Sequence, residues 1–348
     1  MQGNAQRRKL LQSSLTEVAR VAGVSASTVS RYVRGHLRVT PETEDKIITA
    51  MDKVGWERPH VTFLDITSVA LIIPELTNPF FALLAEHVIR IGRERGIDVS
   101  LHVTNGVVSQ EIELIKSLND NEQIQGILFA GSNSLEGLMD PRLITKPFVM
   151  VDEEVFDSAH NNLCLISSDN RNGAYQAVNH LVSCGHTRIA FVGGRTELAT
   201  ARAREAGFRE AMAFHGCAVD EGLVFHGPFS EVFGASILPN IVQANPRPTA
   251  VFVSSDIAAI GILSTAERYS LRIPEDLSIV SCDDINLCDW LRPRLSSVHQ
   301  PMTTMAKGAF DALFAIGVGK PAKSQWYPMK LNIRSSVVSI NKTSDKKG

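Results

Sequence analysis

The sequence predicts an all-α head of three helices, followed by an α/β body of two lobes with doubly wound parallel sheets. Two patterns indicate this division. In residues 15–57, apolar side chains recur at helical spacing, with Gly and Pro where helices begin or end. From residue 69 onward, short apolar runs alternate with helical segments, and these elements number more than ten. So many elements exceed one sheet, and two lobes are therefore expected.

The first two predicted helices of the head meet in a turn at Gly23, and Ser25 is placed to cap the second of them. A third helix is expected to open with Thr40 as N-cap and Pro41 at its first position, and to end near Gly55. The residues expected to pack the first two helices together are Leu15, Val18, Ala19, Ala22, Val24, Val29 and Val33.

The outward side of the second helix carries small, hydroxylic and cationic residues. These are Ala26, Ser27, Ser30, Arg31 and Arg34. A helix with such side chains can enter a DNA major groove, touch base edges and form hydrogen bonds with phosphates. The pattern predicts a helix-turn-helix DNA-binding domain over residues 15–57, and a helical hairpin on a domain surface without a DNA role is the alternative.

The composition suits a small basic head on a larger body. The chain has 348 residues, 44% of them hydrophobic and 21% charged, and its net charge of -2 means that any basic surface is local. Residues 1–60 hold ten Lys or Arg against six Asp or Glu. Residues 1–14 are predicted to be a basic flexible arm, which either contacts phosphates or remains solvated, and residues 341–348 a flexible tail.

Cysteine usage and hydropathy bear on the compartment. The five cysteines lack metal-site spacing, and their odd number does not suit a disulfide framework. We expect no metal, no cofactor and a reducing environment. There is no signal-peptide pattern and no apolar run long enough to cross a bilayer, so the expected location is cytoplasmic, with no membrane partner.

The body is expected to repeat βαβ units. Strands are predicted at 69–73, 99–103, 126–129, 148–151, 189–192, 223–225, 250–253 and 278–281. Helices are predicted at 80–96, 110–119, 171–184, 202–215, 257–269 and 302–316. Residues 58–68 lose helical periodicity, contain Pro59 and several β-branched residues, and are the predicted linker or hinge.

A series of motifs runs through nearly all of residues 15–336. In chain order they are LTEVA (15–19), AGVSASTVSR (22–31), IPELTNPFF (73–81), SDN (168–170), GHTRIAFVGG (185–194), RAREAGF (202–208), SSDIAAIG (254–261), PEDLSIV (274–280) and HQPM (299–302). Each motif alone is weak evidence, but all of them in this order are specific. The sequence resembles the lactose/galactose repressor (LacI/GalR-type) family of bacterial transcriptional regulators, whose members have a periplasmic-binding-protein-like body.

This resemblance implies a homodimer whose two heads read the half-sites of a pseudo-palindromic operator. It also implies that residues 69–340 bind an effector and dimerise. The N-lobe would comprise about 69–168 and 299–325, and the C-lobe about 169–298 and 326–340.

The resemblance also places individual DNA contacts. Ala26, Ser27 and Arg31 lie where the family reads bases, and Arg31 is the best base reader because a guanidinium can bind guanine through two hydrogen bonds. The residues that would mainly hold phosphates are Thr16, Ser25, Thr28 and Ser30. A capping or solvated hydroxyl is the alternative for each of these, and for Ser25 in particular.

The linker departs from the family pattern. Members usually carry an Ala-Arg-x-Leu hinge helix, whose leucine inserts into the central minor groove and kinks the operator. Residues 57–68 lack this motif, and Leu64 is the obvious candidate for such an insertion. The hypothesis is a weaker central kink with relaxed half-site spacing, and a footprint with a sharply kinked central CG step would contradict it.

Polar and aromatic residues follow the predicted strands, where α/β lobes bind small ligands. The candidate effector contacts are Thr77, Asn78, Phe80, Asp152, Thr200, Arg204, Phe229, Asp256 and Asp283. Carboxylates and an arginine can bind paired hydroxyls, and an aromatic ring can stack on a C–H face, so a sugar or sugar derivative is expected. Some of these positions have other possible roles. Asp256 is equally suited to cap a helix, and Asp169 is suited to cap the helix that begins near residue 171. Phe81 and Phe208 are expected in the core.

We expect the protein to repress a carbohydrate-utilisation operon. The effector would change the angle between the lobes, and this change would alter the spacing of the two heads. An α/β enzyme is a competing class, but GxGxxG, Walker and catalytic-triad patterns are absent from the sequence. A soluble sugar-binding transport protein is the other competitor, and it would carry an export signal and no helical head. The sequence favours a DNA-binding regulator that is not an enzyme.

Overall fold

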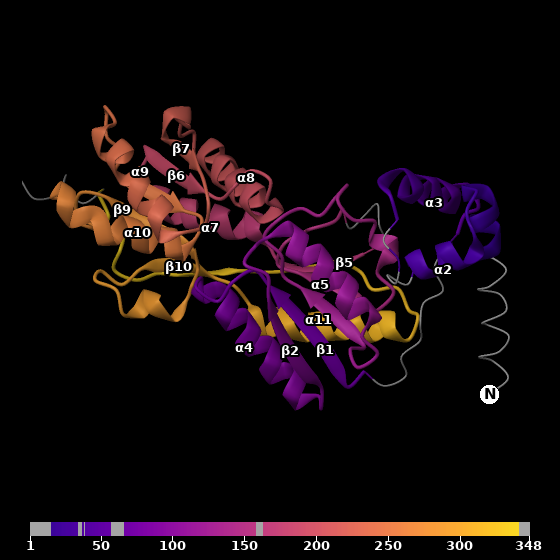
Figure 1. Cartoon of the computed structure of the whole chain (residues 1–348). Helices are drawn as coiled ribbons and strands as arrows, with labels where there is room; N and C mark the ends of the chain where they lie inside the picture. The colour runs from indigo at the N-terminus through magenta and orange to yellow at the C-terminus, as the bar shows by residue number, and fades with distance from the viewer. Residues whose placement is uncertain (1–14, 34–36, 38, 57–65, 158–162, 341–348) are drawn as a thin grey trace, which may run out of the picture.

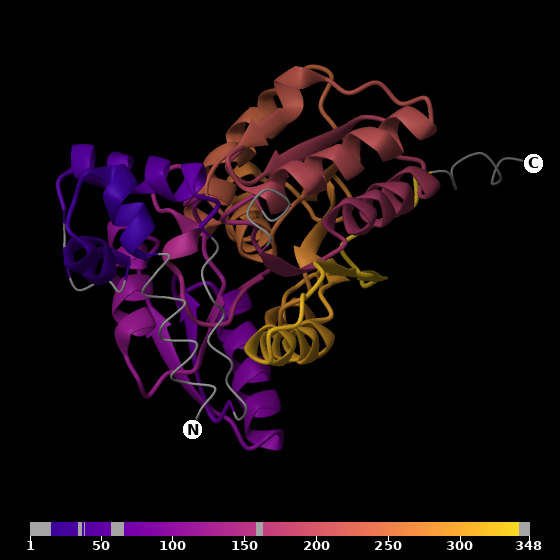
Figure 2. The same cartoon turned by 90° about the vertical axis from the view of Figure 1, so that its right-hand side faces the viewer.

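The computed structural model describes residues 15–33, 37, 39–56, 66–157 and 163–340. A helical head lies beside the first of two α/β lobes, and the second lobe lies at the far end of the molecule (Figures 1 and 2). The predicted fold class is therefore confirmed. The expectations for the arm at 1–14, most of the linker at 58–68 and the tail at 341–348 lie outside the described residues.

The head has the expected three helices, at 15–22, α2 (Ala26–Val33) and α3 (Pro41–Lys53). Gly23 joins the first two in a left-handed conformation (φ 69°), which glycine adopts without steric cost. Thr40 caps α3 by accepting a hydrogen bond from the Thr43 amide. The fully buried residues at the centre of the head are Val18, Val29, Ile47 and Met51.

The N-lobe is built on a six-stranded parallel sheet with the order β11-β5-β4-β3-β1-β2. The strands are β1 (Ser68–Ile73), β2 (Asp98–Val103), β3 (Gly126–Phe129), β4 (Phe148–Val151), β5 (Cys164–Ser168) and β11 (Gln325–Tyr327). Helices α4 (Pro79–Glu94) and α11 (Met302–Gly317) pack on one face and α5 (Val108–Asp120) on the other. Because both faces are covered, β1 is apolar along its length: Leu71 points to one face and Ile72 to the other.

The C-lobe sheet has the order β12-β10-β9-β8-β6-β7 and is parallel except for β12. The strands are β6 (Ile189–Gly193), β7 (Val224–His226), β8 (Ala250–Val253), β9 (Ser278–Asp283), β10 (Ser296–His299) and β12 (Lys330–Asn332). Helices α7 (Asn170–Ser183) and α8 (Ala199–Phe214) cover one face, and α9 (Glu231–Gln243) and α10 (Asp256–Ala266) cover the other.

The chain crosses between the lobes at three points of the described structure: after β5, after β10 and after β11. Strand ends that the sequence separates widely therefore meet in the crevice between the lobes. Four strands, β5, β10, β11 and β12, and the helix α9 were not among the predicted elements. Helix α8 also begins three residues before the predicted helix 202–215, at Ala199.

Candidate functional site

The outward face of α2 is open. The side chains of Ala26, Ser27 and Arg31 are exposed, and those of Thr28 and Ser30 are half-buried. On the inner side, the Tyr32 hydroxyl donates to Glu44 of α3 at 2.6 Å. This bond fixes the rotation of α2 against α3, so the small and cationic residues face away from the head's core.

Ser25 has the capping role that the sequence offered as its alternative. Its Oγ accepts a hydrogen bond from the Thr28 amide at 3.0 Å and lies 2.8 Å from the Ser27 hydroxyl. Thr16 is exposed on the helix 15–22. Leu64 lies outside the described residues.

The head contacts the N-lobe through α3 and leaves the outward face of α2 clear. Arg142, in a short 3-10 helix (Pro141–Leu143), forms an ion pair with Asp52 of α3. Asp140 holds the same guanidinium by accepting from Nη2 at 2.8 Å and from Nε at 3.1 Å. The contact therefore positions the head without covering the surface that the sequence assigns to DNA.

A cavity of about 250 Å³ lies between the two lobes. Seven of the nine predicted effector contacts line it: Asn78, Phe80, Asp152, Thr200, Arg204, Phe229 and Asp283. They come from strand ends and helix starts of both lobes. A cavity of this kind, with polar groups converging in an enclosed crevice, is typical of small-ligand sites.

Arg204 is the polar centre of the cavity and is only 3% exposed. Its Nε donates to Asn170 Oδ1 at 2.7 Å, and its Nη1 donates to the Ser254 carbonyl and lies 3.3 Å from Asp283 Oδ1. Gln300 donates to the same carboxylate at 2.8 Å. Burial raises the pKa of Asp283, and the charge of Arg204 opposes this shift.

Phe229 presents an aromatic face to the same cavity. Its ring centroid lies 5.7 Å from Arg204 Cζ, a cation–π contact. The ring can approach this closely because Gly194 has no side chain: a Cβ at this position would lie 2.3 Å from Phe229 Cζ. The cation–π contact and the missing side chain at Gly194 together explain why Phe229, an aromatic residue after β7, reaches the start of α8.

Asp152 follows β4 and is 8% exposed. Its Oδ1 has no hydrogen-bond partner among the described residues, although it lines the cavity. Burial raises the pKa of Asp152 to about 7, against the opposing effect of Arg204. A buried acceptor without a donor is costly, and a ligand hydroxyl would satisfy it.

Backbone strain concentrates around the cavity. Of the five described non-glycine residues with positive φ, three line the cavity: Asn105 (54°), Asp152 (70°) and Asp283 (120°). Residues with side chains rarely adopt this conformation, and such strain clusters at ligand sites. Here it turns the side chains at the ends of β4 and β9 toward the space between the lobes.

Glu153 is a cavity residue that was not among the predicted site residues, and it is 3% exposed. Its carboxylate accepts from the Ala199 amide at 2.5 Å and from the Thr200 hydroxyl at 2.6 Å. Burial raises its pKa, and these hydrogen bonds oppose the shift. The contact joins the end of β4 in the N-lobe to the start of α8 in the C-lobe. Nothing in the local sequence beyond an acid after Asp152 indicates it.

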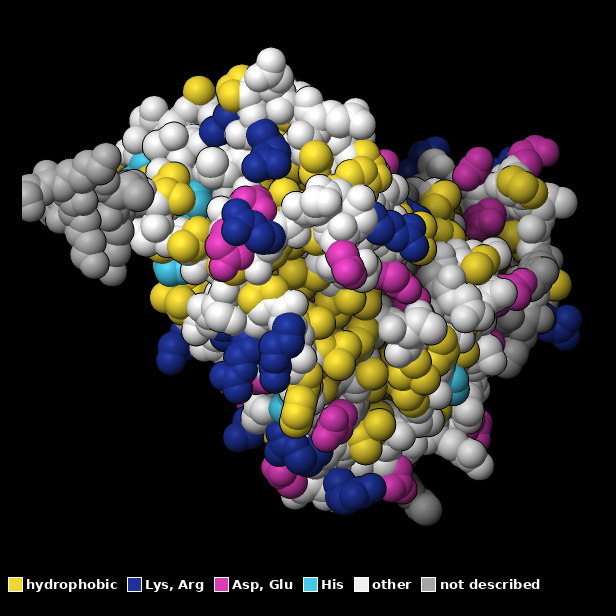
Figure 3. Space-filling view, turned by 90° about the vertical axis from the view of Figure 1, so that its left-hand side faces the viewer, with side chains coloured by type: hydrophobic (Ala, Val, Ile, Leu, Met, Phe, Trp, Pro, Cys, Tyr) yellow, Lys and Arg dark blue, Asp and Glu magenta, His cyan; other side chains and the backbone are white. Residues whose placement is uncertain are grey.

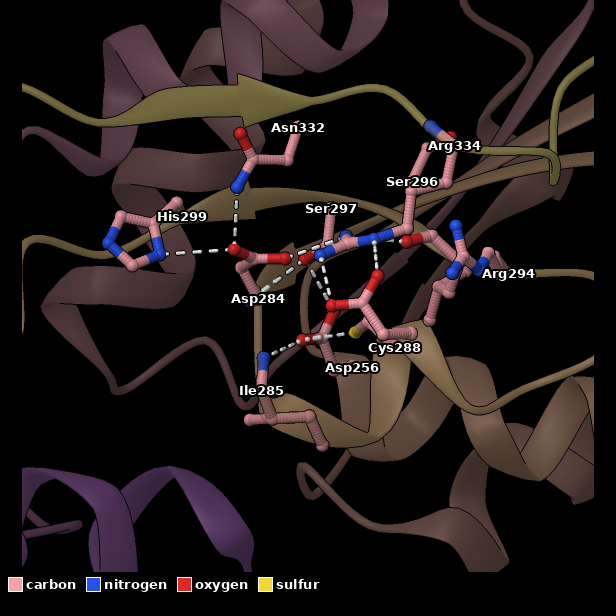
Figure 4. A network of polar contacts seen from close by, with 12 residues as sticks. Asp256, Asp284, Ile285, Cys288, Arg294, Ser296, Ser297, His299, Asn332 and Arg334 are labelled. Carbon is pink, nitrogen blue, oxygen red and sulfur yellow. Dashed lines mark hydrogen bonds and ion pairs between the residues drawn. The ribbon is translucent and has the colours of Figure 1, made fainter.

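Two predicted effector contacts do not reach the cavity. Thr77 is exposed, and its hydroxyl donates to Glu75. Asp256 begins α10 and is fully buried, with Ser255 as the N-cap residue. The Asp256 carboxylate accepts from the Ile285 amide at 2.8 Å and from the Ser297 hydroxyl at 2.6 Å (Figure 4).

The surroundings of Asp256 explain its position. The Ser281 hydroxyl and the Cys288 thiol donate to the same carboxylate, so both oxygens are saturated inside the C-lobe. Next to this network, Asp284 accepts from Asn332 and Arg334, each at 2.7 Å, which ties the end of β9 to β12 and the segment after it (Figure 4). These contacts hold the crossing strands together and do not point into the cavity.

The structure also tests the alternative roles that the sequence gave to Asp169, Phe81 and Phe208. Asp169 caps α7 by accepting from the Asn172 amide at 3.1 Å, which confirms the predicted cap. Asn78 also caps a helix, α4, through the Phe80 amide at 3.1 Å. Phe208 is fully buried as expected, whereas Phe81 packs against the N-lobe core and also lines the cavity, so its core assignment is only part of its position.

Within the described ranges, no group of three His, Cys, Asp or Glu residues is placed to hold a metal ion. No helix in that part of the chain has the length and apolar character needed to span a membrane. All five cysteines are free thiols.

Comparisons with known proteins agree with this geometry. Residues 14–58 match the sequence profile of bacterial regulatory proteins of the lacI family, and residues 178–337 match a periplasmic binding protein-like domain. Catabolite control protein A of Priestia megaterium is 30% identical over 295 residues, which cover 83% of this chain and 88% of that protein. The chain belongs to the LacI family.

Two further relatives cover almost the whole chain. The HTH-type transcriptional repressor PurR of Vibrio campbellii is 29% identical over 337 residues, covering 94% of this chain and 100% of that protein. The structure of a complex of the transcriptional regulator CelR with cellobiose superimposes with a TM-score of 0.73 at 26% identity, covering 92% of this chain and 99% of that one.

Family membership confirms several expectations from the sequence. This LacI-family chain is a DNA-binding transcriptional regulator with a helix-turn-helix head and an effector-binding body. The family consists of regulators and not of enzymes, so the expectation of no enzyme activity is confirmed.

Proposed function

We propose that this chain represses a carbohydrate-utilisation operon in the cytoplasm and is controlled by a small sugar-like effector that binds between its lobes. One observation carries this proposal: a buried polar cavity with an unsatisfied acceptor, Asp152, lies between the lobes, remote from the exposed DNA-facing side of α2. The names of the relatives support it, since one is a repressor and another was solved with cellobiose.

On the DNA side, we assign base reading to the exposed residues of α2. Arg31 would bind guanine through two hydrogen bonds, while Ala26 and Ser27 would contact a thymine methyl or one acceptor. The hydroxyl residues Thr16, Thr28 and Ser30 would hold phosphates and so fix the register of the head, while Ser25 caps α2. The insertion of Leu64 into the minor groove stays a prediction.

In the cavity, we assign the effector's hydroxyls to the carboxylates of Asp152 and Asp283 and to Arg204. Phe80 and Phe229 would stack on its C–H faces. Asn78 and Thr200 line the same space and complete the proposed contacts. Thr77 and Asp256 are left out because they do not line the cavity.

A homodimer would present two heads to a pseudo-palindromic operator. Figure 3, which shows the molecule from its C-lobe end, displays hydrophobic side chains gathered across the middle of one face. Leu287 and Trp290 of the C-lobe are among the large hydrophobic residues that are exposed. Extended apolar surface on a protein of this size supports burial against a second copy.

The three crossings between the lobes suggest how the effector would act. A ligand that contacts both sides of the crevice stabilises one lobe angle over the other, and the N-lobe carries the head through its contact with Arg142. A preference of about 1–3 kcal/mol for one arrangement is enough to change operator affinity appreciably.

A gel-shift titration with the protein's own upstream DNA, with and without a panel of sugars, tests the proposal. The expected result is a salt-sensitive preference for one upstream fragment that an effector changes. Deletion of residues 1–58 should abolish DNA binding and spare ligand binding. If the full chain bound sugars but preferred no promoter fragment over random DNA, it would be a sugar-binding protein without a regulatory role, and the proposal would be wrong.

A further inference from the structure

The start of α8 borders the cavity, since Leu198 and Thr200 line it. Helix N-termini attract anions, because the first N–H groups have no partner within the helix and the helix dipole is positive there. Leu198, the residue before α8, makes no side-chain cap. A ligand carboxylate or phosphate would ordinarily find its best position at such a helix start.

In this chain that position is already taken by the protein's own carboxylate. Glu153 accepts from the Ala199 amide at 2.5 Å, and its other oxygen lies 3.3 Å from the Thr200 amide and 2.6 Å from the Thr200 hydroxyl. The side chain is 3% exposed and comes from the opposite lobe. It therefore fills the anion site at the helix start and keeps its negative charge inside the cavity.

The remaining charges in the cavity are also unfavourable to an anion. Four carboxylates line it, those of Glu75, Asp152, Glu153 and Asp283, against two guanidinium groups. Arg204 already donates through Nε to Asn170 and through Nη1 to the Ser254 carbonyl, and it pairs with Asp283; Arg195 is exposed to water at the edge of the cavity.

The unsatisfied atoms point to the complementary ligand. Asp152 Oδ1 and Ser255 Oγ are buried, line the cavity and have no hydrogen-bond partner among the described residues. A carboxylate oxygen can only accept, so it requires a donor from the ligand. Hydroxyl groups supply such donors without adding negative charge.

We propose that Glu153 is a specificity-determining residue that excludes anionic ligands, so that the effector is an uncharged, hydroxyl-rich molecule and not a sugar acid or sugar phosphate. This inference rests on the proposed function, since it concerns the effector of the same cavity. Glu153 acts by occupying the amide donors of α8 and by repelling a second negative charge in an enclosed site.

Calorimetric titration of the full chain with matched pairs of ligands tests the inference. The pairs keep the pyranose ring in both members and are glucose with glucuronate, glucose with glucose 6-phosphate, and galactose with galacturonate. Each neutral sugar that binds should have a dissociation constant at least about tenfold lower than that of its anionic partner. Glu153→Gln removes the charge at nearly constant volume and should reduce this ratio of anionic to neutral dissociation constants by about tenfold.

The matched control is Glu197→Gln, which removes an exposed acidic charge two residues before α8. Glu197 does not line the cavity, so its substitution should leave the ratio unchanged. An anionic member that bound the unmodified protein as tightly as its neutral partner would overturn the inference. Equal effects of Glu153→Gln and Glu197→Gln on the ratio would do the same.

A second measurement does not depend on knowing the effector. Glu153→Ala should free the amide donors of α8, so that inorganic phosphate raises the melting temperature of this variant relative to sodium chloride of equal ionic strength. The unmodified chain and Glu197→Ala should show no such rise. A phosphate response in the unmodified chain, or none in a folded Glu153→Ala variant, would contradict the inference, and Glu153→Gln takes the same test if the alanine variant does not fold.

These outcomes separate the inference from the function on which it rests. If neutral sugars bind with the expected selectivity but leave operator affinity unchanged, the proposed function fails and the role of Glu153 stands. If an anionic ligand changes operator affinity through this cavity, the proposed function stands and the role of Glu153 is wrong.

Discussion

Arg142 of the N-lobe forms an ion pair with Asp52 of the head, and this is a direct polar link between the DNA-binding and effector-binding parts of the chain. The side chains are 35% and 64% exposed, so water screens the pair. The link is therefore suited to positioning the head and contributes little to overall stability.

We expect a coupling free energy of roughly 0.2–1 kcal/mol between the two residues, because exposed ion pairs are of this size. A double-mutant cycle with Asp52→Asn and Arg142→Gln, measured by urea unfolding, gives this value. The coupling should shrink as salt is added. Strictly additive effects at low salt would show that the two side chains do not interact in solution.

Arg31→Ala should weaken operator binding by about 1–3 kcal/mol and relax the preference at one base pair, because a bidentate arginine–guanine contact would be lost. Arg20→Ala is the control, since Arg20 is an exposed arginine of the same head that pairs with Glu17 at 2.6 Å. Affinities for operator and random DNA, measured at several salt concentrations, separate the two variants. If Arg31→Ala lost the same binding free energy on operator and on random DNA, Arg31 would not read a base.

Affinity for a neutral effector should rise about tenfold between pH 6 and pH 8, as Asp152 becomes ionised. Burial raises the pKa of this carboxyl to about 7, with Arg204 lowering it and Glu153 and Asp283 raising it further. Ligand hydroxyls donate to the ionised form, so binding favours proton release and strengthens as the pH rises. Calorimetry in buffers of different ionisation enthalpy should detect the released proton at pH 7.

Asp152→Asn is the control for this pH dependence, because the amide does not titrate. The variant should bind more weakly at pH 8 and show a flat pH profile between pH 6 and 8. If the variant kept the full pH dependence, another group in the cavity would be responsible.

Asp256→Asn should lower the free energy of unfolding by about 1–3 kcal/mol and leave effector affinity of the folded protein unchanged. The carboxylate accepts from Ser281, Ser297, Ile285 and Cys288, and an amide nitrogen would face one of these donors. Urea unfolding and calorimetry measure the two quantities. Asp289→Asn, whose 54% exposed carboxylate pairs with Arg334, should change stability by less than about 1 kcal/mol. If Asp256→Asn lost effector affinity while remaining folded, Asp256 would be a ligand contact after all.

The sequence by itself determined the elements whose signals are local. Thr40 and Pro41 predict the start of α3, because an N-cap and a proline at the first helical position depend only on neighbouring residues. The apolar run of β1 identifies a strand covered on both faces. Asp152, Arg204 and Asp283 could be placed in a crevice because the ends of parallel strands meet there.

Only the tertiary structure decided the elements and contacts that depend on distant partners. Strands β11 and β12 are three residues long and exist through pairing with β5 and β10, and α9 contains Pro239, which weakens a helical pattern. Glu153 meets α8 because the two lobes close on each other, and its own neighbours in the chain give no sign of this. Asp256 turned into the C-lobe because four donors converge there, and a buried polar group is stable where its hydrogen bonds are complete.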